Sequence, residues 1–194
     1  MRPATLTALP SASSDAIAEL RQRLSTLEKK AQSAPDTNAL CMVVFSGELD
    51  KLLASFVMAT GAAACGMKVS MFFTFWGTAA LKKKGPQSPG KTLVEKMFGW
   101  MLPGGLDRRK LSKLDMGGMG RWMMAREMKK KNVTDLASLI SLAQELEVQI
   151  YICEMSMSLM GITLEELIDN PTMKQCGVAH FLTLASEANT TLFI

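Results

Sequence analysis

Residues 39–77 carry the clearest structural pattern of the chain, ALCMVVFSGELDKLLASFVMATGAAACGMKVSMFFTFWG. The pattern begins with a continuous apolar run over 39–45, which is typical of a strand buried on both faces. A helical pattern follows over 50–65, and Gly66 is suited to end it. A second apolar run, over 69–75, predicts another strand. Strand, helix and strand in this order predict a βαβ unit with a parallel sheet.

The same alternation resumes near the C-terminus. Thr134-Asp135 can cap a helix whose apolar face begins at Leu136, and a third strand is predicted over 148–152. Beyond it we expect two short helices, a longer helix and a terminal strand, at residues 156–161, 163–168, 173–188 and 191–194. Residues 39–194 are therefore predicted to form an α/β domain of three layers, α/β/α, around a mostly parallel sheet of four to five strands.

Two segments stand outside this alternation. Residues 85–131 contain several prolines and glycines, and seven of the sixteen methionines lie between 97 and 128. Helical patterns over 92–101 and 121–130 predict a helical, Met-rich insertion that folds over the domain. Residues 1–38 read as a disordered start, a helix and a linker. The helix has a heptad seam, formed by Ile17, Leu20, Leu24, Leu27 and Ala31.

The heptad seam is too short to be stable alone. It either pairs with copies of itself in a homo-oligomer, which we favour, or packs on its own domain.

Composition bounds the class of protein. The chain of 194 residues is 48% hydrophobic, so it can bury a core, and its net charge is only +4. The lysine runs 82–84 and 129–131 are best explained as solvated helix ends. Binding to an acidic partner surface is the second interpretation. Nucleic-acid binding is the third, because no nucleic-acid motif is present. Residues 49–77 are the most hydrophobic stretch, but Lys51 and Lys68 leave only 16 residues between them. That is short for a transmembrane segment.

The cysteines and the N-terminus favour the cytoplasm. The four cysteines form no CxxC pair and sit in apolar segments, which suits free thiols in a reducing compartment. No secretory signal is evident in residues 1–12. A single histidine, His180, supplies a mixed zinc site poorly, so we expect no metal.

One motif match is rejected. Residues 85–92, GPQSPGKT, fit the P-loop pattern letter for letter. A working P-loop follows a buried strand, whereas lysines precede this one. Its backbone N–H groups must also cradle phosphates, and Pro86 and Pro89 have none to donate.

Cys153 is the sharpest candidate site. It follows the strand over 148–152 and precedes a short helix. Ligands of parallel α/β sheets bind beyond the carboxyl ends of the strands. Helix N–H groups could stabilise a thiolate there, while Glu154 would oppose this if it faced the sulfur. A buried, inert cysteine fits the position equally well.

The segment CEMSMSLMGI, residues 153–162, resembles the cysteine segment of the DsrE/DsrF-like family, in its larger Met-rich branch. Supporting similarities are found at residues 46–51, 72–77, 177–179 and 192–194, and the resemblance covers about 39–194. It implies sulfur transfer in the cytoplasm through a persulfide on Cys153. It also implies homo-oligomers and partners such as a TusA-like sulfur carrier or a rhodanese.

Other residues are expected around this site. Cys176, predicted to begin a helix, is the second thiol candidate, whereas Cys65 and Cys41 are expected to serve packing and core. Supporting residues at the same sheet edge are expected to be Ser46, Gly47, Trp76, Gly77, Met155, Ser156 and Met157. The methionines either fill core or form a soft wall around sulfur.

Two function classes remain open. The first is a sulfur carrier or sulfurtransferase that passes sulfur from Cys153 to a partner thiol, and it requires no cofactor. Catalytic turnover and stoichiometric relay are not distinguished. The second is a non-catalytic binding module that presents the Met-rich insertion to a partner.

Overall fold

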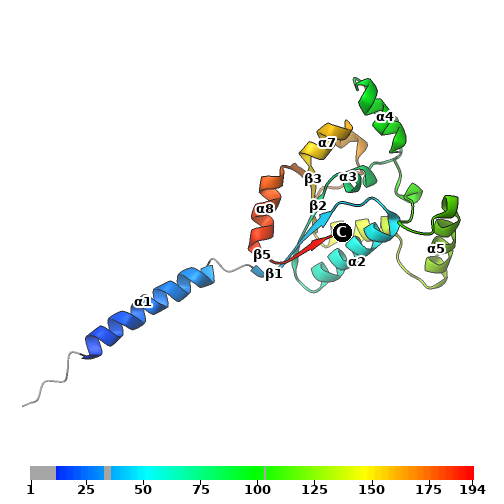
Figure 1. Cartoon of the computed structure of the whole chain (residues 1–194). Helices are drawn as coiled ribbons and strands as arrows, with labels where there is room; N and C mark the ends of the chain where they lie inside the picture. The colour runs from blue at the N-terminus through cyan, green and yellow to red at the C-terminus, as the bar shows by residue number, and fades with distance from the viewer. Residues whose placement is uncertain (1–11, 33–35, 103) are drawn as a thin grey trace, which may run out of the picture. The chain divides into compact units, whose positions relative to one another are not determined.

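The computed structural model describes residues 12–32, 36–102 and 104–194 (Figure 1). The chain divides into two units, residues 1–35 and 36–194. The first unit contains one helix, α1 (Ala12–Gln32), which includes the heptad seam. The expected disorder of residues 1–12 falls almost wholly outside the described residues. β1 begins at Asp36, inside the range 32–38 that was expected to be a linker, and residues 33–35 lie outside the described residues.

The second unit is built on a five-stranded sheet in which every pairing is parallel and the strand order is β4-β3-β2-β1-β5. Its strands are β1 (Asp36–Val44), β2 (Lys68–Phe73), β3 (Gln149–Cys153), β4 (Met173–Cys176) and β5 (Ala188–Phe193). The predicted parallel α/β fold is confirmed. All five carboxyl ends share one sheet edge, because the strands run in the same direction.

Helices cover both faces of the sheet, as expected of parallel strands (Figure 1). On one face lie α2 (Leu49–Ala64) and α6 (Leu136–Glu145), which pack side by side over the main core. Asp135 caps α6 as predicted, since its side chain accepts a hydrogen bond from the Ser138 N–H. On the other face, Phe181 of α8 (Val178–Glu187) stacks on Phe72 with ring centroids 4.7 Å apart.

The prediction of one helix over 173–188 is wrong. Residues 173–176 form the edge strand β4, and α8 begins only after Gly177. The strand is short and half exposed, so it lacks the apolar run that identified the central strands. The terminal strand also starts three residues earlier than expected, at Ala188. Residues 163–168 hold only a 3-10 turn, Leu164–Glu166, and not a helix.

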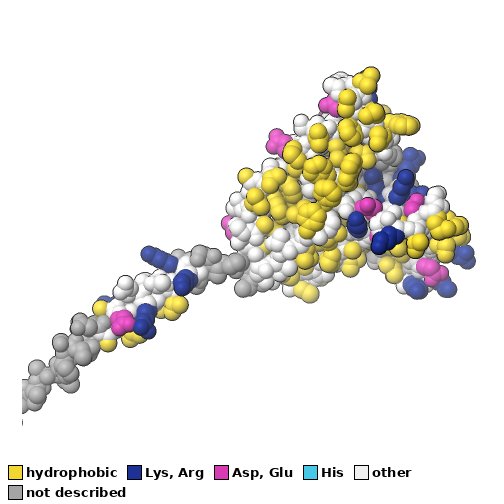
Figure 2. Space-filling view, viewed as in Figure 1, with side chains coloured by type: hydrophobic (Ala, Val, Ile, Leu, Met, Phe, Trp, Pro, Cys, Tyr) yellow, Lys and Arg dark blue, Asp and Glu magenta, His cyan; other side chains and the backbone are white. Residues whose placement is uncertain are grey.

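Short helices carry the chain between strands and through the insertion. They are α3 (Trp76–Ala80), α4 (Leu93–Met101), the 3-10 turns Leu106–Arg108 and Met116–Gly118, α5 (Met119–Lys130) and α7 (Glu154–Met160). The insertion is helical, and α4 lies against α7. Neither α4 nor α5 buries a residue. Figure 2 shows hydrophobic side chains gathered on the outer surface around α4 and α7, where Met97, Met101 and Leu159 are exposed.

No helix within the described part of the chain combines the length and the apolar character that a membrane crossing needs.

Candidate functional site

Cys153 is the last residue of β3 and the N-cap of α7. Its side chain is buried, with 1% of its surface exposed. Alternation along β3 directs Ile150 and Ile152 to the α2 and α6 face, whereas Tyr151 and Cys153 belong to the cluster under α8. The thiol therefore lies at the carboxyl edge of the sheet, on the side that α8 covers.

Hydroxyl groups from two elements meet beside this thiol. Ser156, in the first turn of α7, is fully buried, and its Oγ lies 2.9 Å from the Oγ1 of Thr74. The same Ser156 oxygen accepts a hydrogen bond of 2.9 Å from the Phe75 N–H. Phe75 has a φ of 45°, a conformation that L-residues rarely adopt. The chain is thus held in a strained turn after β2 that is tied directly to α7.

These groups determine the acidity of Cys153. Burial raises the pKa of the thiol, because a charged thiolate loses its water. Hydrogen bonds from the Ser156 hydroxyl and N–H, the Thr74 hydroxyl and the Met155 N–H stabilise the thiolate and outweigh that effect. The pKa of Cys153 consequently lies below its usual value. Buried cysteines surrounded only by apolar groups show the opposite shift.

Cys176 is the neighbour of Cys153 in the sheet. It ends β4, where it pairs in register with Cys153, and it packs against the same cluster under α8. Its predicted place at the start of a helix is wrong, because it is the last residue of the edge strand. Burial, followed by the charges of Cys153 and Glu154, raises the pKa of Cys176. The two thiols are therefore unlike: one acidic and buried, the other weakly acidic and partly exposed.

The four expected supporting residues after β1 and β2 lie at the predicted sheet edge, but not all are near the thiol. Ser46 and Gly47 follow β1, which β2 separates from β3, so they lie roughly 10 Å from Cys153, two strand spacings away. Trp76 and Gly77 begin α3, and Trp76 is half exposed.

The role of both glycines is visible in the packing. A Cβ on Gly47 would meet the Trp76 carbonyl, and one on Gly77 would meet the Val44 carbonyl. The two glycines therefore allow the turns after β1 and β2 to approach closely.

The residues of α7 divide by face. Ser156 contacts the site, whereas Met157 is buried in the main core on the other face of the sheet, and Met155 is half exposed. Glu154 is also exposed. The soft wall of methionines around the sulfur is thus not formed by Met157, which fills core.

Two other cysteines have clear places. Cys41 lies in β1 and is buried, as predicted, and burial, followed by the charge of Glu187, raises its pKa. Cys65 was expected to pack, and that is wrong: it is exposed at the C-cap of α2. Gly61 and Ala64 in the last turn of α2 are exposed as well, whereas Ala62 and Ala63 of that turn pack against the main core.

Sequence reasoning missed Thr74 and Phe75. Both lie in the segment FFTFWG, in which Thr74 is the one hydroxyl among apolar residues. A lone hydroxyl at the end of a buried strand was the available signal, because a buried polar group needs a partner.

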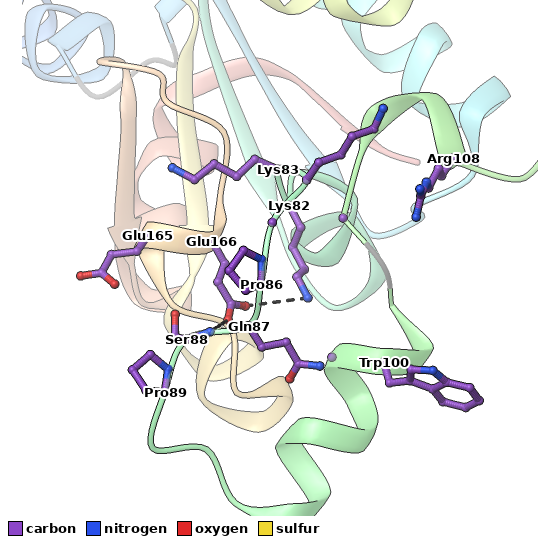
Figure 3. A pocket seen from close by; sticks show the side chains of 14 residues that line it. Lys82, Lys83, Pro86, Gln87, Ser88, Pro89, Trp100, Arg108, Glu165 and Glu166 are labelled. Carbon is purple, nitrogen blue, oxygen red and sulfur yellow. Dashed lines mark hydrogen bonds and ion pairs between the residues drawn. The ribbon is translucent and has the colours of Figure 1, made fainter.

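The P-loop look-alike is occupied by the protein itself. The Ser88 N–H and the Lys91 ammonium both bind Oε1 of Glu166, at 2.6 and 2.5 Å, and Lys82 lies 3.8 Å from Oε2. Thr92 forms a capping box that starts α4. Figure 3 shows Glu166 reaching toward Lys82 in a cavity of about 730 Å³ beside Trp100. An internal carboxylate thus takes the position that a phosphate would need.

Among the residues that the structure describes, no three histidine, cysteine or acidic side chains lie close enough together to hold a metal ion.

Comparison with known proteins places this arrangement in a family. The model of the DsrE/DsrF/DrsH-like family matches residues 36–193, the whole α/β domain. The chain belongs to this family. The family match includes Cys153, Cys176 and the Met-rich insertion, and it begins after α1.

Two relatives each match about four fifths of this chain. The uncharacterized protein YrkE of Bacillus subtilis is 43% identical over 158 residues, which are 81% of this chain and 98% of YrkE. The sulfur carrier protein DsrE2 of Allochromatium vinosum is 34% identical over 167 residues, or 80% of this chain and 97% of DsrE2. The crystal structure of YchN from E. coli matches 81% of this chain and all of YchN, with 11% identity and a TM-score of 0.49.

Proposed function

We propose that this protein is a sulfur carrier that accepts sulfane sulfur as a persulfide on Cys153 and passes it to a partner thiol. The observation that carries the proposal is the hydrogen bonding around Cys153, which lowers the pKa of a buried thiol. Structural cysteines in apolar surroundings have no need of two buried hydroxyls and two N–H groups. The name of DsrE2, a sulfur carrier, supports the same reading.

Loading and transfer are thiol chemistry. The Cys153 thiolate attacks the outer sulfur of a donor persulfide, a bond from Cys153 Sγ to that sulfur forms, and the donor leaves as a thiolate. In the second step an acceptor thiolate attacks the same outer sulfur, and Cys153 leaves as a thiolate. A low pKa favours both steps, because it supplies the nucleophile and later a good leaving group. No electron acceptor is needed, since each step exchanges one S–S bond for another.

The hydrogen-bond donors also suit the loaded form. A persulfide is anionic near neutral pH, so the Ser156 and Thr74 hydroxyls and the Met155 N–H can hold its charge. Cys153 has only 1% of its surface exposed, so a partner needs the site to open or needs an outer thiol. Cys176 is that outer thiol in our proposal, because it is in register with Cys153 and is partly exposed.

The wider setting is part of the same proposal. The partner is a TusA-like sulfur carrier or a rhodanese, since both present a reactive thiol. The protein acts in the cytoplasm as a homo-oligomer. A reducing compartment would keep all four cysteines as the free thiols that the structure contains.

Intact-mass analysis after exposure to polysulfide tests the proposal. The experiment uses a Cys65→Ser background, because Cys65 is an exposed thiol that would load without selectivity. We expect the background protein to gain mass in steps of one sulfur atom and Cys153→Ser to gain far less, because only the weakly acidic Cys176 then remains at the site. Cys176→Ser should still load, but should deliver sulfur to a small thiol acceptor more slowly. Equal loading of Cys153→Ser would remove Cys153 from the mechanism.

A second function has one observation in its favour. The insertion helices α4 and α5 bury no residue, and Leu93 and Trp100 of α4 are more than 80% exposed. Such a surface suits a protein partner. If Cys153 is unreactive, and Trp100→Ser abolishes binding to a purified TusA-like carrier, the protein is a binding module and not a carrier.

A further inference from the structure

The N-terminal helix α1 carries an apolar seam that its own unit does not cover. Ile17, Leu20, Leu24 and Leu27 are 50, 64, 56 and 62% exposed, and hydrophobic side chains alternate with charged ones along α1 in Figure 2. A helix of 21 residues, about 31 Å long, is marginal in water without a packing partner. We propose that α1 pairs, parallel and in register, with α1 of a second copy of this chain.

The first heptad, with Ile17 and Leu20, favours a pair of helices over a larger bundle. In heptad positions Ile17 and Leu24 are a residues, and Leu20 and Leu27 are d residues. A parallel pair stacks each of these residues on its own copy. Ile17 at a, with leucine at d, is the combination that favours a dimer over larger bundles, whereas Leu24 at a is not β-branched and adds no such preference.

The charges select the orientation. Arg23 occupies a g position and Glu28 the e position five residues later, which is the pair that faces across a parallel dimer. The parallel arrangement thus forms two opposite-charge contacts related by symmetry. An antiparallel pair with the same apolar layers would place Arg21 of one helix near Arg21 of the other, and Arg23 near Arg23. These like charges would repel each other.

Within one helix, Arg23 already binds Glu19 at 2.7 Å, but both side chains are more than 60% exposed. The guanidinium has five donors, so it can bind a second carboxylate without releasing Glu19.

This interface is independent of the proposed sulfur chemistry. The family match begins at residue 36, after α1 ends. Relatives are matched over 97 and 98% of their own lengths by about four fifths of this chain. The seam is therefore an addition to the family domain, and failure of either idea leaves the other standing.

Disulfide formation between copies tests the pairing in the full chain. The background is Cys65→Ser. Leu20→Cys should cross-link to itself at least about tenfold faster than Gln22→Cys, which lies at position f on the outer side of the same helix. Adding Arg23→Glu turns two attractions into two repulsions and should slow the cross-linking by about tenfold or more. Restoring complementarity with Arg23→Glu plus Glu28→Arg should recover the rate.

Each outcome decides the matter. Fast self-linking with rescue by the charge swap supports the parallel pair. Linking only when Leu20→Cys is mixed with Leu24→Cys would establish the antiparallel pair and overturn the proposal. Equal, slow linking at Leu20 and Gln22 would mean that α1 packs elsewhere. Far-UV circular dichroism verifies that the variants keep their helix content.

Discussion

Ser156→Ala is the most informative change at the site. The Ser156 hydroxyl is fully buried and contacts the Thr74 hydroxyl and the Phe75 N–H, each at 2.9 Å. Alanine keeps the helix but removes both contacts and the side-chain hydrogen bond to the Cys153 thiolate. Leaving the Phe75 N–H without its acceptor should cost about 1–3 kcal/mol of stability. Its strained φ leaves Phe75 few ways to find another partner.

The larger effect should be on reactivity. Among the causes that lower the pKa of Cys153, the Ser156 side chain is the foremost. A hydrogen bond to a charged group contributes about 1.5–3 kcal/mol, so its loss should slow reaction of the thiol at neutral pH by about tenfold or more. The measurement is the pH profile of iodoacetamide alkylation at Cys153, followed by mass, with Cys65 and Cys176 replaced by serine. The midpoint of that profile should move to higher pH.

The same change alters how stability depends on pH. A thiol whose pKa is lower in the folded state stabilises the fold above its unfolded pKa of about 8.5. That contribution is lost as the pH falls through the folded pKa. The parent protein should therefore gain stability toward mildly alkaline pH in urea unfolding, and Ser156→Ala should gain less.

Ser158→Ala is the matched control for Ser156→Ala, because Ser158 lies on the same helix but is exposed. Coinciding alkylation profiles for the two variants would refute the role of the Ser156 hydroxyl.

Two further predictions concern stability, each with a control from the same chain. Glu166→Gln leaves the buried Lys91 ammonium without its anion, so chemical unfolding should show a loss of about 3–5 kcal/mol, whereas Asp169→Asn, at an exposed pair, should cost about 1 kcal/mol or less. A loss from Glu166→Gln no larger than that from Asp169→Asn would show that the buried pair is not stabilising. Gly77→Ala should destabilise by about 1–3 kcal/mol, because its Cβ meets backbone, whereas Gly61→Ala has open space in a helix and should be neutral or stabilising. Thermal unfolding measures both glycine variants, and equal midpoints would contradict the packing argument.

The sequence by itself determined the parallel sheet and the place of Cys153. Short continuous apolar runs are typical of strands buried on both faces, so β1, β2 and β3 could be identified from the sequence. The carboxyl ends of parallel strands lie at one edge of the sheet. Cys153 and the turn at Ser46 both follow strands, so the sequence predicted both at that edge. The pattern can be recognised locally because a strand that is buried on both faces needs an apolar side chain at nearly every position.

Only the tertiary structure decided what surrounds the thiol. Thr74 is 79 positions from Cys153 in sequence, and nothing local links it to Ser156. The pairing of Cys176 with Cys153 depends on a four-residue edge strand in which Lys174 and Gln175 interrupt the apolar residues, so no apolar run marks it. Hydrogen bonds and register between distant segments arise from packing of the whole sheet, so periodicity and composition cannot predict them.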